Sequence, residues 1–413
     1  MDKPLLRSRL AWWLLAANLI AVAAVIWISE SGTPSLGVPF ALRTVAFSAL
    51  PGWAANDPRP ALASFRRSCT ALLRLPAQQP MGWSGYAGTP AAWRPVCAAA
   101  PSGAATPAQL RGYFETWFAP VSVEGEKPPH FTGYYEPLLA VSRKPTGRFH
   151  VPIYGRPSDL ISADLGKFHA NLTGRHLFGR VAGTQLIPFQ TRAEIDAKGL
   201  ASAPILLYAD DPVSVFFLHI QGSGRVHFAD GDTLRLAFAA TNGRPYTPIG
   251  RVLIDKGALK RSGLSMQRIR DWLETHPSDE NAIMEYDRSF VFFSLAPLGD
   301  PTLGSAGTEG VPLTPRASLA VDARFHPMGA PVYIVTTTPG LHSGEQPFER
   351  LLVAQDTGGA ITGSARGDIY FGFGADAEST AGRMNAQGRF YVLLPKPVAA
   401  ALSPYKAFPD SPS

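Results

Sequence analysis

Short apolar runs separated by glycine and proline fill this chain from about residue 130 to about residue 395. The 413 residues include 39 Gly and 38 Pro, which favour turns and short strands over long helices. Helical spacing of apolar residues interrupts this region once, at residues 265–274. With 46% hydrophobic and 17% charged residues, the composition is that of a globular protein. We therefore predict a mainly β fold.

Two helices are predicted ahead of this β region. In the first, Leu62, Phe65, Cys69 and Leu72 recur at the spacing of one helix face. The second opens at residues 106–109 with Thr, Pro, Ala and Gln. This order combines an N-cap, a proline in the first turn and a capping box. We expect both helices to flank the β domain.

The N-terminus carries basic residues followed by an uncharged, mostly apolar run from residue 11 to residue 28. As a helix this run is just long enough to cross a bilayer, and the positive flank stays in the cytoplasm. Small residues at 21–24 leave cleavage by signal peptidase open, but the run continues past them, which favours an uncleaved transmembrane anchor. We predict a signal or anchor at residues 1–30, a tether at 31–58 and an exported remainder.

The sequence holds two cysteines, Cys69 and Cys97. In an exported protein they are candidates for a disulfide, with two buried thiols as the alternative. The cysteines and the nine His residues show no metal-ligand spacing, so we predict neither a metal nor a cofactor.

The net charge of +6 comes without a run of basic residues interleaved with aromatics, which argues against nucleic acid as a partner. A mildly basic surface suits an anionic cell-wall polymer or anionic lipid, and an ordinary solvated surface is the alternative.

Three aspartates stand at the ends of apolar strands in the C-terminal third. Asp322 and Asp356 each end a run, and Asp368 begins one. A turn role, in which the carboxylate binds turn backbone, is the alternative interpretation for Asp322 and Asp356. Apolar strand residues around Asp368 and the second carboxylate of Asp356 both favour a raised pKa at Asp368. A general acid working near neutral pH requires such a pKa.

The same region resembles a known domain. Residues 353–363, VAQDTGGAITG, and 366–372, RGDIYFG, resemble the 3D domain, which is named for three aspartates, and Asp322 matches the first of them. Four upstream blocks resemble the membrane-bound lytic murein transglycosylase A family: FTGYYEP at 131–137, FLHIQGSG at 217–224, TNGRPY at 241–246 and GVPLTP at 310–315. Together the blocks cover roughly residues 60–397 in collinear order.

The resemblance implies a fold and a division of the chain. A double-psi β-barrel domain would comprise residues 59–137 and 287–413, with a second β-domain inserted at 138–286 and the glycan strand in the cleft between them. Family members often carry a lipid-modified N-terminal Cys, and this sequence has none. We therefore expect a periplasmic protein tethered to the inner membrane, with wall-synthesis proteins as candidate partners.

The resemblance also implies a reaction. A lytic transglycosylase cleaves the MurNAc–GlcNAc β-1,4 bond of peptidoglycan without water and leaves a 1,6-anhydro-MurNAc end. Asp368 would protonate the glycosidic oxygen and then accept the proton of the C6 hydroxyl, with Asp356 close by. One carboxyl suffices because the nucleophile belongs to the substrate, whereas ordinary glycosidases use two.

Sugar binding calls for aromatic faces and polar groups. Residues 215–221 are predicted as a strand that turns Gln221 toward the cleft, with His219 in a structural role. Glu136 is a rival acid, although its place beside Pro137 favours a structural or substrate-orienting role. The candidate binding residues are Tyr134, Tyr135, Glu136, Gln221, Gly222, Ser223, Gly224, Asn242, Tyr246, Gly358 and Gly359.

The sequence has two features that point to other functions. The D-T-G sequence at 356–358 resembles an aspartic peptidase motif, but no second D-T-G or D-S-G completes the dyad. A barrel that binds polysaccharide without cutting it remains the alternative, and it predicts that the wild-type protein releases no product.

Overall fold

The computed structural model describes residues 40–408 apart from the short segments 83–84, 126, 170–171, 173–175, 341–343 and 403–405. The anchor predicted at residues 1–30 and the start of the predicted tether lie outside the described residues. From Phe40 onward the predicted tether is folded, because residues 40–44 form a strand of the largest sheet. Within the described part, no helix combines the length and the apolar character needed to cross a membrane.

A ten-stranded sheet forms the centre of what we call the large lobe. In order across the sheet its strands are β17 (Asn385–Gln387), β3 (His130–Glu136), β16 (Arg366–Phe373), β13 (Ser318–Val321), β15 (Glu345–Asp356), β14 (Pro331–Pro339), β18 (Arg389–Pro395), β2 (Phe118–Glu124), β1 (Phe40–Thr44) and β19 (Lys406–Phe408). The strands at the two ends, β17 and β19, pair on one side only among the described residues. The sheet is therefore open, and the predicted closed barrel is not formed.

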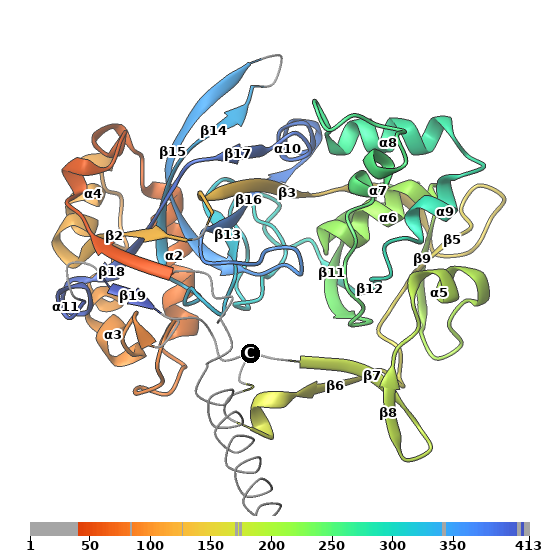
Figure 1. Cartoon of the computed structure of the whole chain (residues 1–413), viewed down its shortest axis with the longest axis horizontal. Coiled ribbons are helices and arrows are strands. Elements are labelled where there is room, and N and C mark those ends of the chain that lie inside the picture. The colour runs from red at the N-terminus through yellow and green to blue at the C-terminus, as the bar shows by residue number, and fades with distance from the viewer. Residues whose placement is uncertain are drawn as a thin grey trace, which may run out of the picture.

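Helices cover this sheet at the left of Figure 1. They are α2 (Arg59–Leu72), α3 (Pro90–Ala98), α4 (Pro107–Trp117) and α11 (Lys396–Ala400), with α10 (Ala375–Ala381) beside β3 and β16 and two 3-10 turns, η1 (Phe47–Ala49) and η2 (Trp53–Ala55). Phe65 of α2 and Phe114 of α4 both pack against Phe118, with ring centroids 5.6 Å apart in each pair. The predictions of α2 and of the capping box that begins α4 are confirmed. Cys69 of α2 and Cys97 of α3 form a disulfide.

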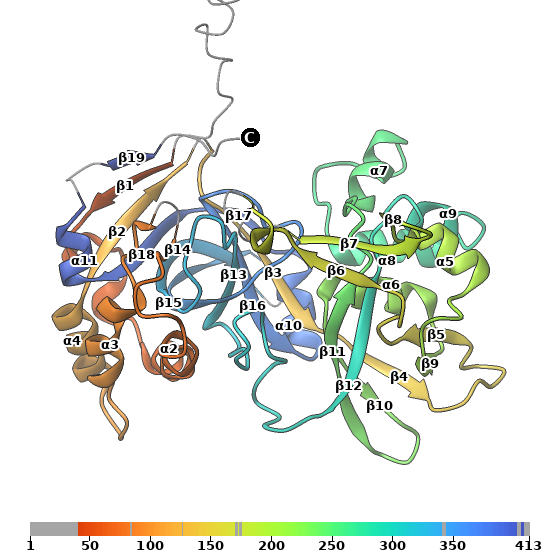
Figure 2. The ribbon, with the colours of Figure 1, turned by 90° about the horizontal axis from the view of Figure 1, so that it is seen from below.

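The remaining elements form what we call the insert lobe, which lies beside the large lobe in Figures 1 and 2. Its six-stranded sheet has the order β12 (Val291–Pro297), β11 (Thr233–Thr241), β10 (Gly224–His227), β4 (Leu138–Ser142), β9 (Ile205–Ala209) and β5 (Val151–Tyr154). A separate three-stranded sheet has the order β6 (Ile161–Asp164), β7 (His176–Ala182) and β8 (Gln185–Pro188), with η4 (Leu165–Lys167) after β6. The helices are α5 (Arg192–Lys198), α6 (Pro212–Gln221), α7 (Ile249–Asp255), α8 (Met266–Thr275) and α9 (Glu280–Met284).

The chain enters the six-stranded sheet at Pro137, between β3 and β4, and leaves it after β12. The boundary expected at residue 286 therefore falls ahead of the last strand of this sheet, since β12 pairs with β11 along its whole length.

The strand predicted at residues 215–221 is wrong, because this segment is part of helix α6. Asp211 caps the helix by accepting hydrogen bonds from the backbone of Val213 and Ser214, and Gly222 ends it with a φ of +78°. Apolar residues on every side of a helix give no periodicity, so a short buried helix and a buried strand look alike in sequence. The prediction of α8 is confirmed, but α5, α6, α7, α9 and α10 also interrupt the β region.

The disulfide gives a first prediction. Cys69 and Cys97 are 28 positions apart, and closing a loop of that length stabilises a protein by about 3.5 kcal/mol. We expect the double variant Cys69→Ala and Cys97→Ala to lose about this much free energy of unfolding, as measured by urea denaturation of the whole protein. Reducing the wild-type protein should give a matching loss. An unchanged midpoint after complete reduction would contradict the prediction.

Candidate active site

The two central aspartates lie on either side of one strand. Asp368 of β16 pairs with Ala320 of β13, and Asp356 of β15 pairs with the same residue from the other side. On its other flank Asp368 pairs with Thr132 of β3. Neighbouring strands are spaced by about 4.8 Å, so the Cα atoms of Asp368 and Asp356 are about 10 Å apart across the sheet. The strand order thus brings the two carboxylates to neighbouring positions of the sheet.

Asp368 is held by a short chain of hydrogen bonds. The hydroxyl of Thr132 donates to Oδ1 of Asp368 at 2.5 Å, and the guanidinium of Arg366 donates to that hydroxyl at 2.6 Å. Burial raises the pKa of Asp368 to about 6, against the opposing effects of Arg366 and Thr132, and the charge of Asp356 adds to the rise. The residue as a whole is partly exposed.

Asp356 has a different environment. Its Oδ2 accepts from the hydroxyl of Tyr134 at 2.9 Å, and its Oδ1 accepts from the backbone N–H groups of Thr308 and Thr357 at 3.0 and 2.9 Å. Burial raises the pKa of Asp356, and these hydrogen bonds oppose the rise because they favour the ionised form. Both carboxylate oxygens of Asp356 therefore accept hydrogen bonds. The carboxyl of Asp368 accepts one, from the hydroxyl of Thr132.

Asp322 belongs to a turn, in keeping with the alternative interpretation of its sequence position. One carboxylate oxygen accepts from the backbone of Arg324 at 3.1 Å, and the other accepts from the backbone of Gly363 at 2.8 Å. The guanidinium of Arg324 also pairs with the carboxylate at 2.6 Å. Only 5% of the residue is exposed. Asp322 therefore fixes the loop that leads into β16.

Glu136 is completely buried where the chain passes between the lobes. Its carboxylate lies 3.0 Å from Arg225 and 3.3 Å from Arg235, and it accepts from the backbone of Ser305 at 2.7 Å. Because no part of Glu136 is exposed, it has no route to a substrate. The geometry supports the structural role and not the rival acid.

Tyr134 and Tyr135 are also buried, with 9% and 2% of their surfaces exposed, so neither ring offers a free stacking face. Tyr134 instead donates to Asp356, and Tyr135 donates through its hydroxyl to Glu378 at 3.0 Å. The backbone N–H of Tyr135 donates to the side chain of Gln221 at 3.0 Å. This bond joins β3 of the large lobe to the C-terminal end of α6.

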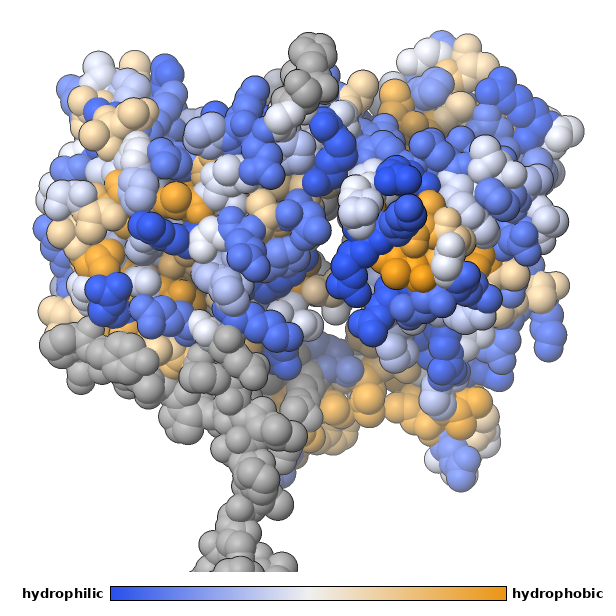
Figure 3. Space-filling view, turned by 45° about the horizontal axis from the view of Figure 1, so that its top comes forward, coloured by the Kyte–Doolittle hydropathy of each residue, from blue (hydrophilic) through white to orange (hydrophobic). Residues whose placement is uncertain are grey.

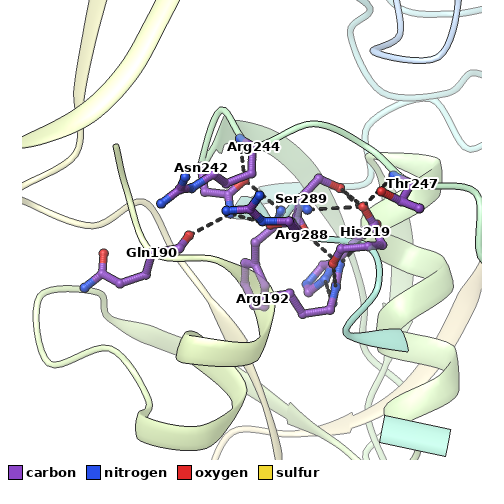
Figure 4. Close-up of polar contacts among 10 residues, drawn as sticks. Gln190, Arg192, His219, Asn242, Arg244, Thr247, Arg288 and Ser289 are labelled. Atoms are coloured by element: carbon purple, nitrogen blue, oxygen red, sulfur yellow. Dashed lines mark hydrogen bonds and ion pairs between the residues drawn. The ribbon is translucent and has the colours of Figure 1, made fainter. Parts of the chain in front are cut away.

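Asn242 is structural, as Figure 4 shows. Its amide nitrogen donates to the carbonyl groups of Gln190 and Arg288 at 2.8 and 2.9 Å. Its amide oxygen accepts from the backbone of Arg244 and Phe290 at 3.2 and 2.9 Å. With all four bonds made and no exposed surface, Asn242 has no capacity left for a sugar.

His219 lies in the same cluster as Asn242 and has the structural role expected of it. Its Nδ1 is 3.0 Å from the guanidinium of Arg192, which can only donate, so Nδ1 is the acceptor of this bond. Burial lowers the pKa of His219 well below its usual range, with the charge of Arg192 as a second cause. His219 is therefore a neutral group that holds α5 against α6.

The surface is hollowed between the two lobes, as Figure 3 shows. Tyr246 of the insert lobe is partly exposed, and burial raises its pKa, with the charges of Asp287 and Asp368 as further causes. A cavity of about 430 Å³ in the same region is lined by Tyr246, Gln221 and Asn385, among others.

The candidate glycines and Ser223 differ in exposure. Gly222 and Ser223 are partly exposed at the end of α6, whereas Gly224 is buried. A Cβ at Gly224 would lie 3.0 Å from the carbonyl oxygen of Pro137, so its lack of a side chain serves packing at the lobe junction. Gly358 and Gly359 are exposed in the turn after Asp356.

Sequence reasoning missed the immediate partners of both aspartates. Thr132 and Arg366 lie inside the blocks that carry the family resemblance, but only the pairing of β3 with β16 places them beside Asp368. Thr308 reaches Asp356 from a loop 48 positions away. Asn385 was also missed, and it pairs with Thr132 from the edge strand β17.

Comparisons with known proteins agree with this arrangement. The family model described as the MltA specific insert domain matches residues 130–294, and the 3D domain model matches residues 317–394. A crystal structure of a membrane-bound lytic murein transglycosylase from Agrobacterium tumefaciens is 33% identical, with a TM-score of 0.75, over 87% of this chain and 99% of that one. The chain belongs to the membrane-bound lytic murein transglycosylase A family.

Two Escherichia coli comparisons extend this result. The membrane-bound lytic murein transglycosylase A of strain K12 is 36% identical over 277 residues, which are 65% of this chain and 66%, just under two thirds, of that protein. A structure of E. coli MltA with bound chitohexaose is 28% identical, with a TM-score of 0.60, over 84% of this chain and 91% of that one.

The raised pKa of Asp368 predicts a dependence of stability on pH. The folded-state value of about 6 exceeds the ordinary value of the unfolded chain, so stability is fully present below about pH 4 and is lost as the pH rises through about 6. We expect Asp368→Asn to be more stable than wild type by about 1–2 kcal/mol near pH 7.5 and equal to it near pH 4. Urea denaturation at both pH values measures this, with the exposed Asp376→Asn as control. A difference that does not change with pH would refute the prediction.

Glu136 gives a prediction about the lobe junction. Removing the carboxylate with Glu136→Ala leaves Arg225 and Arg235 buried without their partner, which should cost about 3–5 kcal/mol of unfolding free energy. The exposed Glu124→Ala should change stability by less than about 0.5 kcal/mol. Thermal denaturation of the two variants makes the comparison, and a Glu136→Ala protein as stable as wild type would show that the ion pairs are dispensable.

Proposed function

We propose that this protein is a peptidoglycan lytic transglycosylase that cleaves the MurNAc–GlcNAc β-1,4 bond non-hydrolytically and leaves 1,6-anhydro-MurNAc ends. The observation that carries the proposal is Asp368, a partly exposed residue whose carboxyl has a pKa of about 6 and lies one strand away from Asp356 on the other side of β13. Family membership supports the reaction class, and the chitohexaose bound to the E. coli relative supports a β-1,4-linked amino sugar as ligand.

The proposed reaction needs one proton donor, which is then regenerated. Asp368 gives its proton to the glycosidic oxygen, the bond from this oxygen to C1 of the muramyl residue breaks, and positive charge develops at C1. The C6 hydroxyl of the same residue attacks C1, and its proton passes to the carboxylate of Asp368. No water is consumed, so exclusion of water from the cleft favours this outcome over hydrolysis.

Asp356 has a supporting role in this proposal. Its negative charge raises the pKa of Asp368, which keeps the acid protonated before the reaction. The same charge favours the positive centre at C1 once the bond breaks. Tyr134, Thr308 and Thr357 stabilise the ionised form of Asp356 through their hydrogen bonds.

We also propose where the protein works. Residues 11–28 are an apolar run behind a basic flank, and the curated relatives are named membrane-bound. Both points support a periplasmic enzyme tethered to the membrane. For the division into domains, the strand pairing supports an insert that runs from Leu138 through the end of β12.

The activity is tested with purified sacculi and mass spectrometry of the released fragments. We expect 1,6-anhydro-muramyl ends from wild type, and a rate at least about 100-fold lower from Asp368→Asn, because a general acid contributes about 10²–10⁴ in rate. Reducing ends would mean a hydrolase. Sacculi that are bound but left intact would favour a polysaccharide-binding protein.

The pH dependence of this activity separates the roles of the two aspartates. The rate should fall as the pH rises through about 6, because Asp368 loses the proton that it must donate. Asp356→Asn removes a charge that raises the pKa of Asp368, so in this variant the rate should fall at a lower pH than in wild type. Initial rates between about pH 4 and pH 8 measure the shift, with Asp376→Asn as control. If the rate fell at the same pH in wild type and in Asp356→Asn, Asp356 would not be what raises the pKa of Asp368.

A further inference from the structure

A buried polar cluster lies behind the strand that carries Asp356. Gln355 precedes Asp356 in β15, and successive side chains of a strand point to opposite faces, so Gln355 points away from Asp356 and toward α2. Its amide nitrogen donates to the carbonyl of Ser64 at 3.1 Å and to the hydroxyl of Ser68 at 2.9 Å. Its amide oxygen accepts from the hydroxyl of Ser318 at 2.5 Å. No surface of Gln355 or of the three serines is exposed, so the cluster fixes β15 from the side opposite Asp356.

Glu309 attaches the loop ahead of β13 to this cluster. The hydroxyl of Ser68 donates to Oε2 of Glu309 at 2.6 Å, and the backbone N–H of Glu309 donates to the carbonyl of Gln355 at 3.1 Å. Gly329 lies against the carboxyl group, because a Cβ built at Gly329 would be 2.6 Å from Oε1 of Glu309. Both the side chain and the backbone of Glu309 are therefore held by α2 and β15.

The carboxyl of Glu309 has no part in the proton transfers of the proposed reaction. Burial raises its pKa to about 7, and hydrogen bonding by Ser68 and Gln355 opposes the rise. A glutamine has the shape of the neutral acid and can accept the bond from Ser68 in the same way, whereas an alanine has no acceptor. Substitution by glutamine and by alanine therefore separates loss of the charge from loss of the hydrogen bond.

The neighbour of Glu309 contacts Asp356 directly. The backbone N–H and the hydroxyl of Thr308 each donate to Oδ1 of Asp356 at 3.0 Å. Among the effects that lower the pKa of Asp356, the backbone N–H of Thr308 is the largest, ahead of Tyr134 and Thr357. Thr308 is exposed, so water competes for its donors and the two bonds depend on a backbone that is held in place. Glu309 supplies that support from the next position in the chain.

We propose that Glu309 is a positioning residue for the bond cleavage, an inference that rests on the proposed function. The hydrogen bond from Ser68 fixes the side chain of Glu309, and Thr308 is thereby held where both of its donors reach Asp356. Glu309 acts through Thr308 and Asp356 and not on the reacting atoms. The polar cluster between α2 and β15 is thus part of the support of the reaction site.

These contacts predict how the loss of this support reaches the acid. Without the donors of Thr308 the pKa of Asp356 rises, so Asp356 is protonated over more of the pH range. The pKa of Asp368 then falls, because the charge of Asp356 raises it while Arg366 and Thr132 lower it. Asp368 therefore loses its proton, and the protein its activity, at a lower pH than in wild type.

The first test needs no turnover. Full-length protein in detergent, labelled with ¹⁵N-threonine, gives NMR amide signals for Thr308 and Thr357, which both donate to Asp356. In Glu309→Ala we expect the Thr308 signal to leave its hydrogen-bonded position and the Thr357 signal to titrate at a higher pH than in wild type. Glu309→Gln should keep both wild-type signals, and the exposed Thr302→Ala is the matched control from the same loop. A Thr308 signal that is the same in Glu309→Ala and wild type would overturn the inference.

Turnover of glycan strands tests the link to the reaction. We expect kcat of Glu309→Ala to fall about tenfold with little change in KM, and its rate to be lost at a lower pH than in wild type. A purely structural defect would instead lower the rate equally at every pH. Glu309→Gln should keep the wild-type pH profile, and Ser68→Ala, which removes the donor to Glu309, should reproduce the profile of Glu309→Ala.

A double variant tests the route from Glu309 to the acid. In the Asp356→Asn background, Glu309→Ala should no longer move the pH profile, because the two changes act through the same charge. An equal shift in that background would rule out Asp356 as the link and overturn the inference. Absence of anhydro products from wild type would instead refute the proposed function, while the amide signals of Thr308 and Thr357 would still decide whether Glu309 positions Thr308.

Discussion

The junction between the lobes depends on one buried carboxylate. Glu136 ends β3, the strand that carries Thr132 and Tyr134, and it is held between Arg225 and Arg235 of the insert lobe. An ionised group in this position is tolerated only because opposite charges and a backbone donor surround it. The arrangement fixes the end of β3, and through that strand it fixes the residues that hydrogen-bond to both central aspartates. Strand β3 therefore joins the lobe junction, through Glu136, to Asp368 on β16, through Thr132.

Two aspartates on one sheet have acquired different properties from their hydrogen bonds. Asp356 accepts from a tyrosine hydroxyl and two backbone N–H groups, which stabilise its charge. Asp368 has one hydroxyl donor, so burial prevails and its pKa rises to about 6. Burial also raises the pKa of Asp356, but more hydrogen bonds oppose the rise there than at Asp368.

Local patterns were predictable from the sequence, and contacts between distant segments were not. The capping box that begins α4 involves residues three positions apart, so its prediction is confirmed. The family blocks also indicated Asp356 and Asp368, because each block is a run of neighbouring residues that can be read directly from the sequence. Tyr134 and Asn242 were predicted to bind sugar, but both make structural hydrogen bonds. The sequence does not reveal these bonds because the partners, Asp356 and Phe290, are 222 and 48 positions away. The helix α6 was mistaken for a strand because it is apolar on nearly every side.

The chain crosses between the lobes at Pro137 and again after β12, so the insert lobe is nested within a loop of the large lobe. The pairing of β13, β15 and β16 that carries Asp356 and Asp368 is completed without any strand of the insert. The sequence of α7, α8 and the loop between them can therefore change without altering the strand pairing that holds Asp356 and Asp368.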